Sequence, residues 1–154
     1  MDKEKTYQEL YPQIKALIEK ESDLIANLGN VCAALHFPFN FHWTGFYLVK
    51  KNELVLGPFQ GPVACTRIGF DKGVCGKAWK QKNTLIVADV NQFDGHIACS
   101  PFSKSEIVIP LIINDEVWGV LDIDSSEFDT FDEIDRKYLS SICEALNFSY
   151  ISNN

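Results

Sequence analysis

The sequence lacks any apolar run of about 18 residues, the length that a membrane-spanning helix requires. Its first residues, MDKEKTYQEL, are charged where a secretory signal peptide has an apolar segment. It also lacks internal repeats, low-complexity tracts and linkers. We therefore expect a cytoplasmic protein that has no membrane partner.

Basic clusters are missing as well, because the 14 Lys and Arg residues are scattered among 21 Asp and Glu residues. The formal net charge is -7, whereas general nucleic-acid binders neutralise phosphates with clustered cations. We therefore expect no nucleic-acid partner, but a small molecule or another protein. A chain of 154 residues, 46% of them hydrophobic, is long enough for one well-packed domain, which we assign to 1–154.

Hydrophobic periodicity predicts helices at both ends of this domain. Apolar residues recur every three or four positions over about 3–36, as in two amphipathic helices, and again over about 132–151. In the core, about 37–130, β-rich segments meet at turn residues: FHWTGFYLVK and ELVLGPFQG at Lys51-Asn52, EIVIPLII and EVWGVLDIDS at Asn114-Asp115. This pattern predicts an α+β fold with an antiparallel sheet.

The segments between the two hairpins contain three of the five cysteines. VACTRI continues the first hairpin as a third strand and contains Cys65, and VCGKAWKQK, after Gly73, is a short helix that contains Cys75. TLIVADV is a strand or extended segment, and the loop NQFDGHIACSPFSK contains Cys99. Loops of this length commonly carry function.

An odd number of cysteines fits a reducing compartment, in which a disulfide is transient and either catalytic or redox-sensing. Cys32 and Cys143 lie on apolar helix faces, where a free cysteine behaves as a small buried hydrophobe. We therefore expect structural roles for these two.

The other three cysteines are candidates for reactive thiols, because a helix N-terminus or a nearby cation lowers the pKa of a thiol. Cys99 precedes Ser100-Pro101, which we expect to cap a short helical turn. Cys75 lies in the first turn of its helix, between Lys72 and Lys77. Cys65, in a strand, has no such local support.

A zinc site is the alternative use of these thiols. His96-x-x-Cys99 is half of a ligand pair, and Cys65 and Cys75 would complete four ligands. In structural zinc sites, about two to four residues usually separate paired cysteines, as in C-x2-4-C. The separation between Cys65 and Cys75 is longer. We therefore expect no metal.

Carboxylates and aromatic residues gather on the predicted strands. Asp122 and Asp124 alternate in VLDIDSS and share a sheet face, and Glu106 opens the preceding strand. Paired carboxylates repel, so one tends to hold a proton near neutral pH and can donate it. Alternatively, these carboxylates simply lie in solvent at the end of a strand and have no role in chemistry. Trp43 and Tyr47 also share a strand face, where core packing is the default role.

The order HWTGFYL, GPFQGPVACTRI, GVCGKAW, DGHIACS, SEIVIPL and GVLDIDS resembles the free methionine-(R)-sulfoxide reductases over about 25–148. These enzymes are built on a single GAF domain. The resemblance implies a central antiparallel sheet with the N- and C-terminal helices on one face, and a short helix and loops that cover a ligand pocket on the other. General GAF sensors share the fold but not the spacing of the three cysteines.

The family reduces the free amino acid's R sulfoxide and is recycled by thioredoxin, ultimately from NADPH, with no other cofactor and commonly as a homodimer. By position, the resemblance assigns the attacking thiol to Cys99, the resolving thiol to Cys65 and a less settled role to Cys75. The remaining matches are pocket residues. They are the carboxylates Glu106, Asp122 and Asp124 and the substrate-packing Trp43, with Tyr47 on the same strand face.

A mechanism follows from these assignments. The Cys99 thiolate attacks sulfur, Glu106 or Asp124 protonates the oxygen, and a second thiol converts the resulting sulfenic acid to a disulfide. Because three carboxylates oppose a thiolate, we expect the ionised ones to hold the substrate's ammonium group. Backbone amides around Ser100 to Ser103 would then receive its carboxylate.

Two other functions remain open, a non-catalytic GAF ligand sensor and a thiol redox sensor without turnover. A sensor is normally joined to an output domain, and the last predicted helix ends close to residue 154. We therefore expect a stand-alone enzyme.

Overall fold

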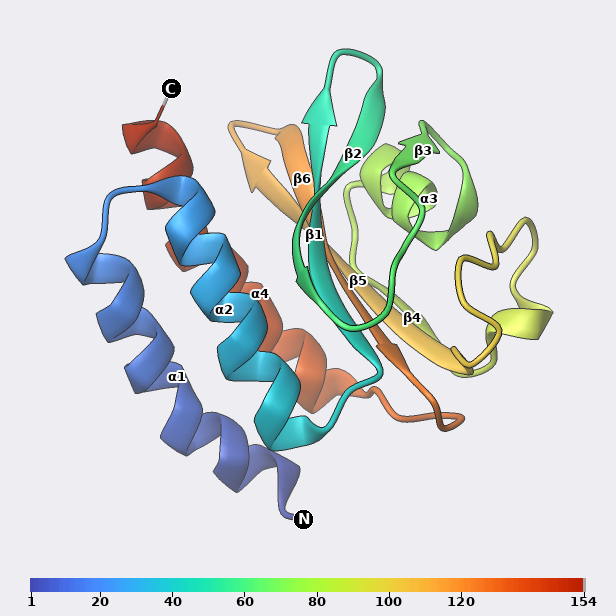
Figure 1. Ribbon diagram of the computed structural model, residues 1–154, viewed down its shortest axis with the longest axis horizontal. Coiled ribbons are helices and arrows are strands. Elements are labelled where there is room, and N and C mark those ends of the chain that lie inside the picture. The colour runs from blue at the N-terminus through green and yellow to red at the C-terminus, as the bar shows by residue number, and fades with distance from the viewer. Residues whose placement is uncertain (154) are drawn as a thin grey trace.

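The computed structural model describes residues 1–153, which form one six-stranded sheet with helices on both faces (Figure 1). The helices are α1 (Lys3–Lys20), α2 (Leu24–Phe39), α3 (Gly73–Gln81) and α4 (Glu133–Ser152), with a 3₁₀ turn η1 (Val90–Gln92). The strands are β1 (Trp43–Lys50), β2 (Glu53–Gln60), β3 (Arg67–Gly69), β4 (Leu85–Val87), β5 (Ser105–Ile113) and β6 (Glu116–Ser125). The predicted α+β fold is confirmed.

The sheet is antiparallel throughout, in the order β3-β2-β1-β6-β5-β4. The two predicted hairpins are β1–β2 and β5–β6, and β6 pairs with β1 to join them at the centre. The third strand is shorter than expected, because β3 begins at Arg67 and leaves Cys65 in the preceding loop. Because Cys65 lies in a loop, the alternation of side chains along a strand does not fix the direction of its side chain.

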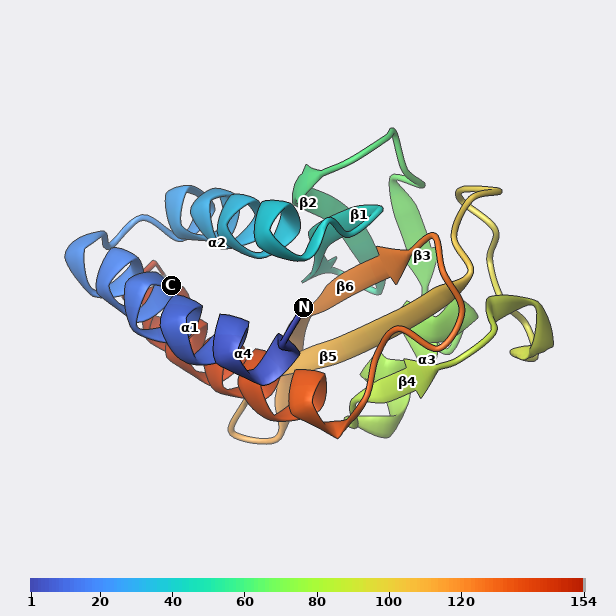
Figure 2. The ribbon, with the colours of Figure 1, turned by 90° about the horizontal axis from the view of Figure 1, so that it is seen from below.

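Helices α1, α2 and α4 lie together on one side of the sheet, as Figure 2 shows from below. Asp2, Asp23 and Asp132 each cap a helix by accepting a hydrogen bond from a backbone amide in its first turn. The apolar faces of the three helices bury the larger hydrophobic core against β1, β5 and β6. Cys32 and Cys143 are buried in this core as free thiols, in keeping with structural roles.

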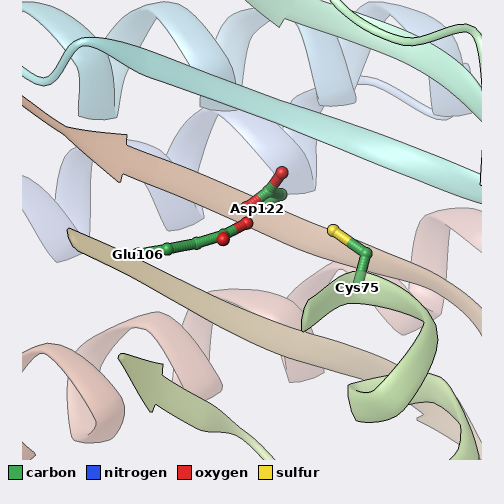
Figure 3. Close-up of side chains that lie close together, drawn as sticks. All are labelled: Cys75, Glu106 and Asp122. Carbon is green, nitrogen blue, oxygen red and sulfur yellow. The ribbon is translucent and has the colours of Figure 1, made fainter. Parts of the chain in front are cut away.

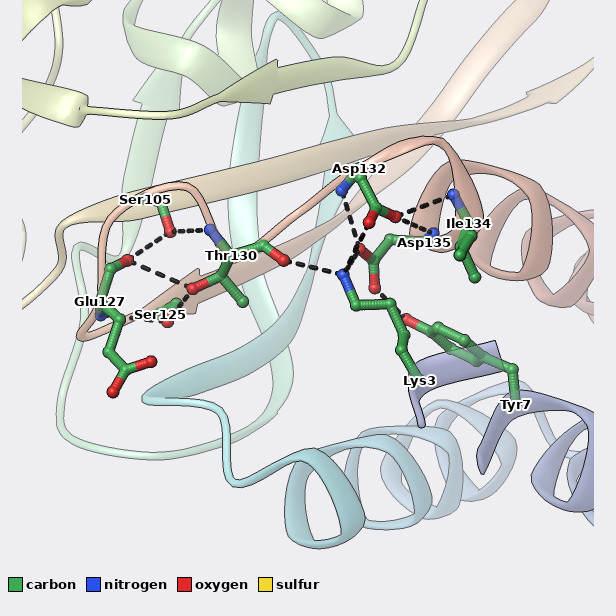
Figure 4. A network of polar contacts seen from close by, with 9 residues as sticks. All are labelled: Lys3, Tyr7, Ser105, Ser125, Glu127, Thr130, Asp132, Ile134 and Asp135. Atoms are coloured by element: carbon green, nitrogen blue, oxygen red, sulfur yellow. Dashed lines mark hydrogen bonds and ion pairs between the residues drawn. The ribbon is translucent and has the colours of Figure 1, made fainter. Parts of the chain in front are cut away.

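A buried carboxylate fixes α1 against the start of α4 (Figure 4). Asp135 accepts hydrogen bonds from the Tyr7 hydroxyl at 2.7 Å and from Lys3 Nζ at 2.6 Å. It also accepts one from the backbone amide of Asp132 and so completes a capping box. Because Asp135 is fully buried, these donors compensate the cost of removing its charge from water.

Helix α3 and the loop 88–104 cover the other face of the sheet, where Figure 1 shows them at the right. A second, smaller core lies beneath them and contains Trp43, Tyr47, Val74 and Cys75. This is the side on which the resemblance puts a ligand pocket. No helix within residues 1–153 is long and apolar enough to cross a membrane.

Candidate active site

One pocket lies between this face of the sheet, the first turn of α3 and the loops on either side. Its lining includes eight of the nine residues that the sequence singled out: Trp43, Tyr47, Cys75, Cys99, Ser100, Glu106, Asp122 and Asp124. The ninth, Cys65, is bonded to one of them. The nine predicted site residues therefore come together although they are spread over six separate segments of the chain.

Cys65 and Cys99 form a disulfide between the loop before β3 and the loop before β5, with Cα atoms 5.6 Å apart. Both residues are partly exposed, and Cys99 lines the pocket. The disulfide thus lies at the pocket and joins two partly exposed residues, as attack by an external thiol requires. This pairing is the one expected of an attacking and a resolving cysteine.

The helical turn expected after Cys99 is absent from the described chain. Ser100 and Pro101 instead enter a tight turn, in which Ser100 Oγ accepts a hydrogen bond from the amide of Phe102 at 3.3 Å. Ser100 Oγ also contacts His42 Nε2 at 3.0 Å. The expected helix-terminal support for a Cys99 thiolate is therefore wrong, because the hydroxyl closes a local turn rather than a helix.

Cys75 is in the first turn of α3, as predicted, but it is only 3% exposed. Burial, followed by the nearby charge of Asp122, raises the pKa of its thiol well above the ordinary value. Lys77, expected to lower that pKa, is instead paired with Asp71 at 3.7 Å. The expected lowering of the Cys75 pKa is therefore wrong.

Three carboxyl groups form the floor of the pocket. Glu106 on β5 is the register partner of Asp124 on β6, and Asp122 stands two residues away on the same face as Asp124. Glu106 is 5% and Asp122 6% exposed, so the alternative of a solvated strand end is wrong for these two.

Burial is the first cause that raises the pKa of all three acids. The pKa values of Glu106 and Asp124 rise well above the ordinary range, because each also faces the charge of Asp122. The pKa of Asp122 rises less, because hydrogen bonding to Glu106 and Cys75 favours its ionised form. The cluster thus combines two proton-holding acids with one residue that ionises more readily.

Two residues that the sequence did not assign to the pocket support these acids. Ser103 Oγ donates a hydrogen bond to Asp124 Oδ1 at 2.8 Å, and His96 Nε2 lies 3.8 Å from Glu106 Oε1. Both come from the long loop, so their approach to strand residues depends on tertiary folding. The HxxC pattern singled out His96 as a metal ligand, and Ser103-x-x-Glu106 has the spacing of a capping box, but neither pattern predicts a contact with the pocket acids.

Trp43 and Tyr47 stack in the wall of the pocket with ring centroids 5.8 Å apart. Trp43 Nε1 donates a hydrogen bond to the carbonyl of Pro62 at 3.0 Å, and the Tyr47 hydroxyl donates one to the carbonyl of Cys65 at 2.8 Å. Both aromatic residues therefore hold the Cys65 loop in place. Gly45 makes room for this packing, because a Cβ atom there would overlap the Trp43 ring.

A cluster of three potential metal ligands lies within this site (Figure 3). Cys75 Sγ and carboxylate oxygens of Glu106 and Asp122 all lie within 4.8 Å of one another. This cluster differs from the zinc ligands considered in the sequence analysis, which were His96, Cys99, Cys65 and Cys75. The disulfide prevents Cys65 and Cys99 from acting as metal ligands.

A GAF-domain family model matches residues 22–148 of the chain. The chain belongs to the GAF-domain family. This GAF domain is 59% identical over 146 residues to GAF domain-containing protein A of Dictyostelium discoideum, covering 94% of this chain and 92% of that protein. It is 42% identical over 147 residues to the free methionine-R-sulfoxide reductase of Escherichia coli, and the match covers 95% of this chain and 89% of that protein.

Among solved structures, the GAF domain resembles the free methionine-R-sulfoxide reductase from Neisseria meningitidis in complex with its substrate. The TM-score is 0.97 at 47% sequence identity, and the match covers 99% of this chain and 92% of that one. The single GAF domain and the resemblance to this group of reductases, both predicted from the sequence, are confirmed.

Proposed function

We propose that this protein reduces free L-methionine-(R)-sulfoxide to L-methionine. The observation that carries the proposal is the Cys65–Cys99 disulfide at a pocket whose floor holds three carboxyl groups, two of them, Glu106 and Asp122, buried. A thiol pair able to form a disulfide supplies the two electrons that sulfoxide reduction needs, and neutral buried acids supply protons. The reductases named among its relatives support this reaction.

In the first step, the Cys99 thiolate attacks the sulfoxide sulfur while a neutral carboxyl group, Glu106 or Asp124, protonates the oxygen. The oxygen then moves to Cys99 as a sulfenic acid, and methionine is released. The Cys65 thiol attacks the sulfenic sulfur, water leaves, and the disulfide forms. Sulfur in the substrate is reduced and the two thiols are oxidised, so that electrons and atoms balance.

The pocket also suits a free amino acid. Asp122, the most readily ionised acid of the three, would hold the substrate's ammonium group. Backbone amides of the turn at Ser100 to Ser103, rather than a helix N-terminus, would receive its carboxylate. The stacked wall of Trp43 and Tyr47 offers an apolar surface for the methyl end.

An external dithiol must reduce the disulfide before the next cycle, and we propose thioredoxin, supplied from NADPH, as that partner. No further cofactor enters the proposed reaction. A cycle of this kind requires a reducing compartment, in keeping with the expected cytoplasmic location.

We also propose a homodimer. Ile25 near the start of α2 and Phe148 near the end of α4 are 55% and 74% exposed, and these helix ends contact each other through Asn27 and Ser149. A contiguous exposed apolar patch commonly marks an interface, and we propose that these two residues belong to one. Light scattering, which measures the molar mass in solution, tests the proposal. The wild type should be a dimer, and Phe148→Glu should be a monomer because the charge disrupts the apolar contact.

A coupled assay tests the function. The protein is mixed with thioredoxin, thioredoxin reductase, NADPH and free methionine sulfoxide, and NADPH consumption is followed together with methionine release. Turnover on the R epimer supports the proposal. A ligand sensor would consume no NADPH, and a redox sensor would be reduced once and then stop, so either result would contradict it.

A further inference from the structure

The Cys75 thiol has no step in the proposed cycle, because Cys65 and Cys99 already form the disulfide pair. Its surroundings nevertheless belong to the pocket. Figure 3 shows the sulfur of Cys75 on α3 pointing toward Asp122 on β6, with the Glu106 carboxyl group reaching Asp122 from β5. Three different elements thus bring one thiol and two carboxyl groups to a single point, where their ligand atoms lie within 4.8 Å of one another.

Asp122 provides a second observation that points to a ligand. Its Oδ1 atom is the one buried side-chain nitrogen or oxygen within residues 1–153 that has no hydrogen-bond partner, and the residue is only 6% exposed. A buried carboxylate oxygen without a donor is costly, and a bound cation is one way to compensate it. Asp122 is thus both a member of the cluster and the residue with the unpartnered oxygen.

We propose that Cys75, Glu106 and Asp122 bind a divalent zinc-like cation. One thiolate and two carboxylates are typical zinc ligands, and three protein ligands with an open fourth position are common for this ion. The thiolate favours zinc over magnesium and calcium, which prefer oxygen ligands alone. His96 Nε2, 3.8 Å from Glu106 Oε1, stands close enough to contribute from the loop side.

The position of the thiol is preformed. The turn before α3 is closed by hydrogen bonds from the amide of Asp71 to the carbonyl of Gly76, at 3.1 Å, and from the amide of Gly76 to the carbonyl of Lys72, at 2.8 Å. Gly76 also packs so closely on the carbonyl of Gly69 that a Cβ atom there would clash at 2.5 Å. Cys75 therefore meets the carboxyl groups without rearrangement of the helix.

The ion would occupy the position proposed for the substrate's ammonium group, so that zinc and substrate exclude each other. This consequence rests on the proposed function, whereas metal binding itself does not. In the oxidised protein, Cys65 and Cys99 cannot bind a metal because they form the disulfide. Zinc binding by the oxidised protein therefore distinguishes the proposed site from a site that uses these two cysteines.

The test uses the oxidised full-length protein, freed of metal with a chelator and confirmed to hold the free thiols of Cys32, Cys75 and Cys143. Calorimetry with Zn²⁺ and absorption spectroscopy with Co²⁺ then measure affinity, stoichiometry and thiolate ligation. We expect one ion per chain, proton release on binding, and a thiolate-to-cobalt charge-transfer band.

Cys75→Ser should weaken Zn²⁺ binding at least about 100-fold and abolish the cobalt band, because loss of an outer-shell partner alone costs about 10- to 100-fold. Asp122→Asn should weaken binding while the band persists at saturating Co²⁺. Cys143→Ser, a buried thiol in the other core, is the matched control and should bind as the wild type does. Wild-type affinity or an intact band in Cys75→Ser, or equal loss in Cys143→Ser, would overturn the proposal.

A kinetic arm tests the exclusion separately. Zn²⁺ should raise the apparent KM for free methionine sulfoxide in the wild type. If the protein binds zinc through Cys75 but shows no sulfoxide turnover, the metal site stands and the proposed function fails. If the wild type turns over the sulfoxide but Cys75→Ser binds Zn²⁺ as tightly as the wild type does, the proposed function stands and the metal site fails.

Discussion

Glu106 and Asp124 are register partners on the neighbouring strands β5 and β6, and their carboxyl groups face the same pocket as Asp122. Adjacent buried carboxylates cannot all ionise, because each charge opposes the next. The β-sheet register therefore favours protonated acids in the pocket that Cys99 also lines, and protonated acids are what the proposed proton transfer needs.

Asp124→Asn tests which of the two acids donates the proton. The substitution keeps the shape of the side chain and removes its titrating group, and a general acid accounts for roughly 100- to 10,000-fold in rate. We expect a loss of that size in kcat with little change in KM, measured by methionine release. Glu106→Gln is the paired variant, and near-normal turnover of Asp124→Asn across pH would assign the proton to Glu106 instead.

The same acids should make the protein less stable as the pH rises. Their folded-state pKa values lie above the unfolded values near 4, so between these limits the folded protein binds more protons than the unfolded chain. The free energy of unfolding therefore falls with rising pH, by up to about 1.4 kcal/mol per pH unit for each such group.

Glu106→Gln removes one of these groups and isolates its contribution. In urea unfolding from about pH 5 to about pH 8, the variant should gain stability relative to the wild type as the pH rises. Asp115→Asn, at an exposed turn, serves as the control and should give a nearly constant difference. Parallel curves for Glu106→Gln and the wild type would contradict the raised pKa.

A substrate comparison tests the role of Asp122. N-acetyl methionine sulfoxide lacks the ammonium charge, so that binding it would bury the carboxylate without a counter-charge, at a cost of several kcal/mol. We expect turnover of the free amino acid and almost none of the acetylated form. Asp122→Asn should lower the preference between the two, and equal rates for the wild type on both would refute ammonium recognition.

Much of the fold follows from local sequence signals. Both long hairpins form where turn residues separate β-rich segments, and Cys32 and Cys143 lie in the core because they belong to apolar helix faces. Apart from the strand predicted at Cys65, which is a loop, two wrong expectations concern thiol activation. They were read from sequence neighbours, Ser100-Pro101 and Lys77, but the first forms a turn and the second pairs with Asp71.

Tertiary contacts explain why local reasoning fails there. The pKa of the Cys75 thiol is raised first by burial and then by the charges of Asp122 and Glu106, which come from strands far along the chain. Ser103 reaches Asp124 by the same folding of the loop onto the sheet. The shared face of Asp122 and Asp124, in contrast, follows from the two-residue period of a strand and was predictable.

The cysteines can be told apart by a single turnover. If Cys99 is the nucleophile, the pre-reduced Cys99→Ser protein should release no methionine, because a hydroxyl lacks the nucleophilicity of a thiolate. Cys65→Ser should release about one methionine per site and then accumulate a sulfenic acid on Cys99, since its resolving thiol is gone. Cys75→Ser, with the Cys65–Cys99 pair intact, should complete the cycle. Each variant is quenched after one equivalent of sulfoxide, trapped with dimedone and mapped by mass spectrometry; methionine release from Cys99→Ser with an adduct on Cys65 or Cys75 would reverse the assignment.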